Sequence, residues 1–178
     1  MEFVASSVRA LRSVNANGTA TASTDGFSFS TRLSNMGLMN LFDRAEPDGY
    51  PEVGPSWISA GTLVERIRYI QAFCNSGTGD DAGNNVCDPV ALLKKKVPAG
   101  SWDNAGAVAD YFLSILYPGE GAGNLSLYRA AAMNFLNTAD TGTTSSPFNT
   151  LGNTTTTYDT RVRGMVSMLM TFPRFQEQ

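Results

Sequence analysis

Two cysteines carry the best-defined chemistry in this sequence. Cys74 and Cys87 flank a polar, glycine-rich segment, residues 75–86, that has no apolar core of its own. A disulfide that closes such a loop removes about 3 kcal/mol of conformational entropy from the unfolded chain in the chain-entropy model. Because disulfides persist in oxidising compartments, the spacing predicts a Cys74–Cys87 disulfide in a periplasmic or extracellular protein. The alternative is two unrelated thiols, with Cys74 packed as a small apolar residue on a helix face.

Oxygen-bearing side chains gather in and beside the same segment. Asp80, Asp81 and Asp88 are the calcium candidates, but they do not follow the ligand spacing and glycine position of an EF-hand loop. A zinc site is not expected, since the chain has no histidine and its two cysteines are the only thiols. We therefore expect a polar, disulfide-closed loop without a metal, and no cofactor elsewhere.

The absence of histidine removes the commonest general base near neutral pH. Neither a Ser-His-Asp nor a Cys-His arrangement can be completed from these residues. Paired carboxylates could still act as acid and base, but the acidic residues are scattered and their spacing selects no pair. Asp110 is expected at the surface of its helix. We assign no catalytic residue, and an enzyme is not the favoured class.

The segment 47–59 combines two large aromatic side chains with several prolines and glycines. Proline fixes φ and glycine permits tight turns, so this loop is expected to be stiff. A stiff loop can dock Tyr50 and Trp57 against the helix that begins near Ser59 and bury their apolar area. The same rigidity suits an aromatic platform for a sugar ring. Docking is the favoured interpretation, with ligand binding through Tyr50 and Trp57 as the alternative.

The amino-acid composition limits the classes of partner that this chain can bind. The 178 residues include 13 basic and 16 acidic side chains, and charged residues make up 16% of the chain. Such a low, balanced charge cannot gather the phosphates of a nucleic acid, and the run Lys94-Lys95-Lys96 is expected to be a solvated helix end. No apolar run approaches the roughly 18 residues that a membrane span needs. We expect a protein partner or self-association, no nucleic acid and no membrane span.

Helical periodicity dominates the sequence, and strand alternation is scarce. The pattern predicts a single all-α domain over residues 1–178, an irregular bundle of six or seven helices with long polar loops. Capping signals stand at Ser59 or Thr62 and at Asp88-Pro89, and Pro173 is expected to end the last helix. The expected helices span residues 2–13, 30–42, 59–74, 88–96, 103–117, 125–136 and 158–172, and residues 138–157 are expected to form an exposed loop.

Short motifs along the chain resemble a known family. They are Glu2-Phe3-Val4 with Arg12, Gly49-Tyr50-Pro51 with Ser56-Trp57, then Arg66, and finally Phe172-Pro173-Arg174-Phe175-Gln176. Their order and spacing resemble the C-terminal part of the domain-of-unknown-function family 1800. That family typically shows a proline-glutamate-phenylalanine helix ending in an arginine, a Gly-Trp-Pro then Trp loop, an arginine in the next helix and a closing Pro-x-Phe-Gln.

The resemblance implies a helical, exported bacterial protein, and it transfers no activity and no catalytic residue. Arg66 joins Tyr50 and Trp57 as a candidate binding residue through this resemblance. Tyr50 stands where the family favours tryptophan. Family members are usually several hundred residues long, so the chain is expected to be the C-terminal portion of a longer member.

Two classes of function follow. The first is a non-catalytic helical module of an exported bacterial protein that serves assembly or partner binding through an apolar surface patch. The second is an accessory or catalytic part of an enzyme that acts on an extracellular polymer, and its self-contained form requires a cleft with two acids about 5 to 9.5 Å apart. A third hypothesis, glycan binding through Tyr50 and Trp57, requires both rings to be exposed.

Overall fold

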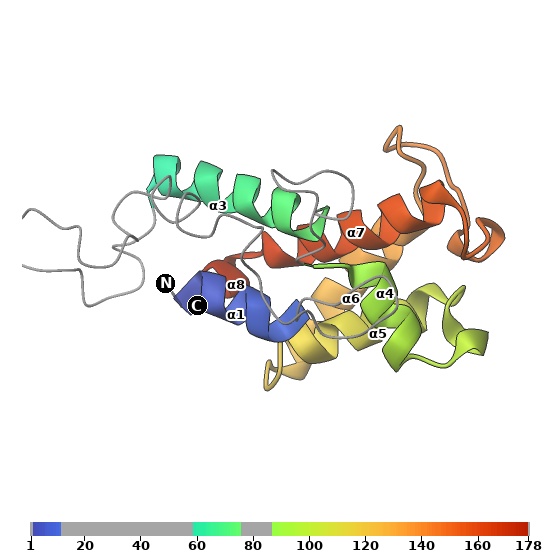
Figure 1. Cartoon of the computed structure of the whole chain (residues 1–178), viewed down its shortest axis with the longest axis horizontal. Coiled ribbons are helices and arrows are strands. Elements are labelled where there is room, and N and C mark those ends of the chain that lie inside the picture. Colours follow the sequence, from blue (N-terminus) through green and yellow to red (C-terminus); the bar gives the residue numbers. More distant parts are fainter. Residues whose placement is uncertain (1, 12–58, 76–86, 178) are drawn as a thin grey trace, which may run out of the picture.

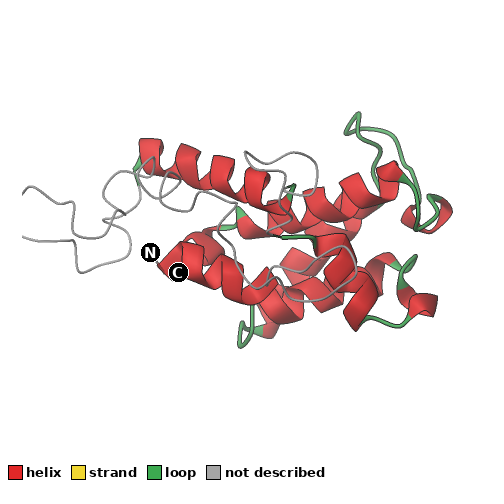
Figure 2. Cartoon of the chain, in the orientation of Figure 1, coloured by secondary structure: helices red, strands yellow, loops and turns green. Residues whose placement is uncertain are grey.

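The computed structural model describes residues 2–11, 59–75 and 87–177, and within these ranges the fold is all-α, as predicted (Figures 1 and 2). These ranges contain no strand, and an isolated antiparallel bridge joins Thr138 and Ser145. None of the described helices is long and apolar enough to cross a membrane. The expected helix over residues 30–42 lies outside the described residues. The α-helices are α1 (Glu2–Leu11), α3 (Ala60–Cys74), α4 (Pro89–Lys96), α5 (Ala105–Leu116), α6 (Ala122–Leu136), α7 (Thr156–Met170) and α8 (Pro173–Gln176).

Helix α7 is the centre of this bundle. It packs against α3, α4, α5, α6 and α8, and Figure 1 shows α3 on one side of it and α4 and α6 on the other. Eight of its 15 residues are buried, including the consecutive Arg161, Val162 and Arg163. Consecutive residues point in different directions around a helix, so α7 is enclosed on more than one side.

Local capping chemistry fixes where α3 and α4 begin. The Ser59 hydroxyl accepts the backbone N–H of Thr62 (3.2 Å), and the Thr62 hydroxyl accepts the N–H of Ser59 (2.7 Å). Asp88 caps α4 by accepting two backbone N–H groups, and Pro89 follows as the first helical residue. These caps confirm the predicted starts, because the polar side chains satisfy N–H groups that the first turn leaves unpaired.

The first and last helices meet through aromatic rings. The ring centroid of Phe3 in α1 lies 5.7 Å from that of Tyr69 and 5.8 Å from that of Phe175 in α8, both edge to face. Figure 1 places the two marked chain ends next to each other. Pro173, expected only as a stop signal, also opens α8, because proline suits the first position of a helix.

The loop expected over residues 138–157 is not exposed throughout. Phe148 lies in a short 3₁₀ turn, Phe148–Thr150, and its side chain is fully buried. Its ring stacks on Tyr158 with centroids 4.9 Å apart. One aromatic residue in a Thr- and Ser-rich segment therefore anchors the loop to the start of α7, which corrects the prediction of a wholly exposed loop.

Gly164 of α7 lies in close contact with Phe135 of α6. A methyl group built there would lie 2.8 Å from a ring carbon of Phe135. We expect Gly164→Ala to lower the free energy of unfolding by about 1–3 kcal/mol, because overpacking forces the ring or the helix to move. Gly123→Ala in α6 is the control, since its methyl group would meet no atom within 4 Å and should stabilise by up to about 1 kcal/mol. Urea unfolding followed by circular dichroism measures the free energy of unfolding of both variants. Equal values for Gly164→Ala and Gly123→Ala would contradict the close contact at Gly164.

Candidate functional site

A buried ion pair joins three helices at one point. Arg163 of α7 donates to the carboxylate of Asp88 (2.8 Å) and to the main-chain carbonyl of Cys74, the last residue of α3 (3.0 Å). The same oxygen of Asp88 accepts the N–H groups of Val90 (3.1 Å) and Ala91 (3.2 Å) at the start of α4. Asp88 and Arg163 are 9% and 8% exposed. One carboxylate oxygen of Asp88 thus serves both as the counter-ion of Arg163 and as the cap of α4.

The two cysteines meet beside this ion pair. Cys74 and Cys87 are both fully buried, and no disulfide joins them in the structure. Burial raises the pKa of the Cys87 thiol well above its usual range, as does its hydrogen bond with Cys74. The Cys74 thiol also contacts the thioether of Met170, with Sγ and Sδ 3.8 Å apart. The fold brings the predicted pair together, and the disulfide bond itself stays a prediction.

The calcium candidates do not form a described site. Asp80 and Asp81 lie outside the described residues, and Asp88 is occupied by Arg163 and the α4 cap. In the described part of the chain, no group of three His, Cys, Asp or Glu residues lies close enough to hold a metal ion.

Arg66, the candidate binding residue of α3, lies in the interior at 2% exposure. Its Nη1 donates to the carbonyl of Gln176, the last residue of α8, and its guanidinium lies 4.8 Å from the centroid of the Phe3 ring. Burial lowers the pKa of this guanidinium, and its Nε has no hydrogen-bond partner among the described residues. The contacts of Arg66 with Gln176 and Phe3 hold α3 to α8 and α1. The other two candidates, Tyr50 and Trp57, lie outside the described residues.

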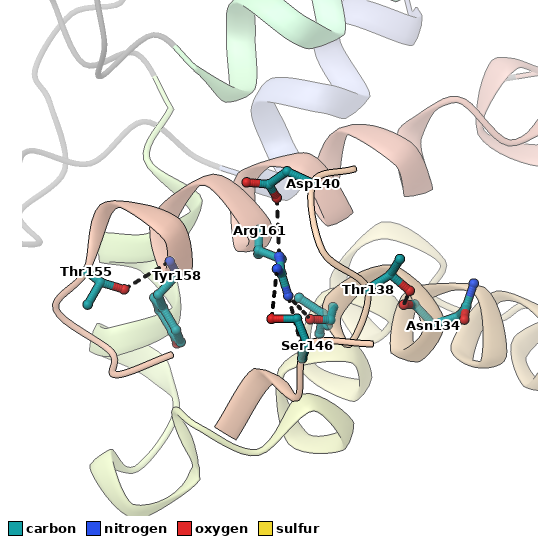
Figure 3. A network of polar contacts seen from close by, with 8 residues as sticks. Asn134, Thr138, Asp140, Ser146, Thr155, Tyr158 and Arg161 are labelled. Carbon is teal, nitrogen blue, oxygen red and sulfur yellow. Dashed lines mark hydrogen bonds and ion pairs between the residues drawn. The ribbon is translucent and has the colours of Figure 1, made fainter. Parts of the chain in front are cut away.

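Arg161 holds the loop between α6 and α7 (Figure 3). Its Nη1 donates to the carbonyls of Leu136 (3.0 Å) and Ser146 (3.1 Å), and its Nη2 donates to the Ser146 hydroxyl (3.1 Å). Asp140 approaches its Nε at 3.4 Å, but the Asp140 side chain is 68% exposed. Figure 3 shows the guanidinium between Asp140 and Ser146. This network closes the loop between α6 and α7.

The lysine run at the end of α4 behaves differently from the prediction at Lys94. Its Nζ donates to the carbonyl of Asn153 (2.6 Å) and lies 5.8 Å and 5.5 Å from the ring centroids of Trp102 and Tyr158. Lys94 is therefore half-buried against two aromatic rings, because a cation is attracted to the face of a π system, whereas Lys95 and Lys96 are exposed as predicted. Spacing alone could not reveal this arrangement, since two of the partners, Asn153 and Tyr158, lie far along the chain.

An open groove runs along the C-terminal end of α5. A cavity of about 720 Å³ lies between α1, α5 and α8, and one of about 440 Å³ lies between α5 and α6. The two share Ser114, Tyr117, Pro118 and Gly119. Their volumes are in the range of small-molecule sites, so this groove is the candidate binding site of the described residues.

The acids in the larger cavity are not arranged for acid and base catalysis. Arg174 donates to Glu120 (3.1 Å) and to Glu177 (3.5 Å). The pKa of Glu120 is lowered, chiefly by a hydrogen bond from the Asn124 amide and also by the Gly121 N–H and Arg174. A general acid needs a raised pKa, so Glu120 is poorly suited to that role, and both carboxylates instead contact Arg174.

A family model described as a protein of unknown function (DUF1800) matches residues 1–177. The chain belongs to the DUF1800 family. This confirms the family that the sequence motifs predicted. No curated protein and no solved structure gives a significant match. The DUF1800 description assigns no activity, so a function for this member has to be argued from its own residues.

Removing Arg163 tests the buried ion pair. We expect Arg163→Met to lower the free energy of unfolding by about 3–5 kcal/mol, because it leaves the buried Asp88 without its counter-ion. The control is Arg129→Met, since Arg129 and its partner Asp110 are 47% and 55% exposed and such pairs contribute at most about 1 kcal/mol. Denaturant unfolding measures both variants. Similar losses from the two variants would show that the Arg163–Asp88 pair is no more important than a surface pair.

Proposed function

We propose that this chain is a non-catalytic helical module of an exported bacterial protein, the C-terminal portion of a longer family member, and that it serves assembly or partner binding. The observation that carries the proposal is the outer face of α6. Only Ala132 and Leu136 of this helix are buried, whereas Leu127 is 66% exposed. The single charged residue of the helix is Arg129.

The outer face of α6 consists of exposed residues that carry no charge. Gly123, Leu127, Ala130 and Asn134 follow one another at spacings of three and four, so they lie on one side of the helix. A helix that faces only water normally presents charged and polar residues on that side. The cores of protein interfaces are depleted of charge, and small side chains let a second backbone approach closely. The face is therefore better suited to a protein partner than to solvent.

The groove extends this surface. Leu125, Ser126 and Arg129 of α6 line the smaller cavity together with Leu113 and other residues of α5. A partner seated on α6 would meet an apolar hollow on one flank. By contrast, the alternative of an enzyme acting on an extracellular polymer has less support, because both acids of the larger cavity contact Arg174. Glycan binding through Tyr50 and Trp57 falls outside the described residues.

Mass spectrometry of the unreduced protein from its native source tests two parts of the proposal: that the protein is exported, and that the chain is part of a longer protein. We expect a Cys74–Cys87 cross-linked peptide, because the two thiols are in contact and an oxidising compartment favours the bond. We also expect peptides that map upstream of Met1. Free thiols at both positions in freshly alkylated samples would count against the oxidising compartment, and a native start at Met1 would count against a longer protein.

Site-specific photo-crosslinking in the producing bacterium tests the surface of α6. A photoreactive side chain at position 127 should give a discrete adduct, with a second copy or with another protein, because α6 is the proposed contact. Position 64 is the matched control, since Val64 is the other large apolar residue that is exposed among the described residues, at 48%. The same adduct from both positions, or none from position 127, would contradict the proposal.

A further inference from the structure

Three sulfur atoms from three parts of the chain meet in the core. Cys74 ends α3, Cys87 directly precedes the cap of α4, and Met170 ends α7. The thiols of Cys74 and Cys87 are hydrogen bonded to each other, and Cys74 Sγ lies 3.8 Å from Met170 Sδ. All three side chains are 0% exposed. A thiol pair with a thioether beside it is a set of soft ligands.

We propose that, in the reduced chain, Cys74, Cys87 and Met170 form a three-sulfur site for a soft monovalent cation, copper(I). Metal–thiolate bonds of about 2.3 Å, as in zinc sites, that meet at about 110–120° place two sulfurs about 3.8–4.0 Å apart. The Cys74–Met170 separation of 3.8 Å already has this value. The sulfurs of Cys74 and Met170 are therefore already spaced to share one cation.

The surroundings favour copper(I) over zinc. Zinc in structural sites almost always takes four ligands, and the carboxylate of Asp88, the residue after Cys87, already pairs with Arg163 and caps α4. Binding transfers both thiol protons to solvent, so two thiolates and one monovalent cation leave one net negative charge. Arg163 is already paired with Asp88, so it balances that charge only in part: at Cys87 the attraction of Arg163 outweighs the repulsion of Asp88. A buried charge needs such compensation.

The same two cysteines can instead form a disulfide. Exchange with a disulfide oxidant would join their sulfurs, with two electrons passing to the oxidant and two protons released with them. The cross-linked and metal-bound states exclude each other, because the metal needs both thiolates. The metal site is argued from the sulfur geometry, and it does not rest on the role proposed for α6.

A competition titration of the fully reduced 178-residue chain, without oxygen, tests the site. Copper(I) is shared between the protein and a coloured copper(I) chelator, and we expect one ion per chain. Met170→Leu should weaken binding by at least about tenfold, since losing even a group that only orients a metal ligand typically costs that much. Met165→Leu is the matched control, because Met165 is also fully buried in α7. It should bind as the unsubstituted chain does.

Leucine replaces methionine with little change in volume, and thermal melting will show whether both variants keep the fold. Because the sulfurs are fully buried, each chain is also refolded in the presence of copper(I). Equal affinities of Met170→Leu and Met165→Leu would exclude the thioether as a ligand. Unchanged binding by a Cys74→Ser, Cys87→Ser double variant would show adventitious binding only, and a reduced chain that takes up no copper(I) by either route would overturn the proposal.

Discussion

The fold depends on buried guanidinium groups that satisfy the carbonyls at helix ends. Arg66, Arg161 and Arg163 donate to the main-chain oxygens of Gln176, Leu136 and Cys74, which are the last residues of α8, α6 and α3. The last carbonyls of a helix have no partner within the helix and carry the negative end of its dipole. Inside a protein no bulk water reaches them, so an unpaired carbonyl is costly. Arginine suits this role because it stays charged and presents several donors in a rigid plane.

These guanidinium groups differ in how their charge is balanced. Arg163 has a buried carboxylate, and Arg161 has an exposed one at a longer distance. Arg66 has no carboxylate partner among the described residues and rests on the Phe3 ring. An apolar side chain of similar size could fill each space, but it would leave the carbonyl unpaired. The arginines therefore specify which helix end meets which neighbour, and packing alone would allow other arrangements.

Local signals in the sequence were enough to predict the class of fold and several helix starts. Ser59 and Asp88-Pro89 act through atoms two or three residues away, so their roles can be recognised without knowing the fold. Lys94 and Phe148 were misjudged because their partners, Asn153 and Tyr158, lie in other segments. Arg161 and Arg163 were missed for the same reason, and Arg66 was expected to bind a ligand, whereas it is buried and contacts Gln176. The sequence Arg161-Val162-Arg163 gave no local signal of burial, because charged residues that flank an apolar residue are ordinarily exposed.

The sulfur cluster could be predicted from the sequence only for the residues that lie close together along the chain. Cys74 and Cys87 flank one loop, so their meeting could be expected, but Met170 joins them only because α7 crosses the end of α3. Elsewhere in the described interior the polar groups mostly bind one another or the backbone: Asp88 caps a helix, Glu120 holds Arg174, and Arg161 closes a loop. Groups committed in this way are poorly placed to exchange protons with a substrate. Among the described residues, two features keep binding capacity that internal contacts do not satisfy: the uncharged face of α6 and the sulfur cluster. A function of this chain is therefore expected at one of them.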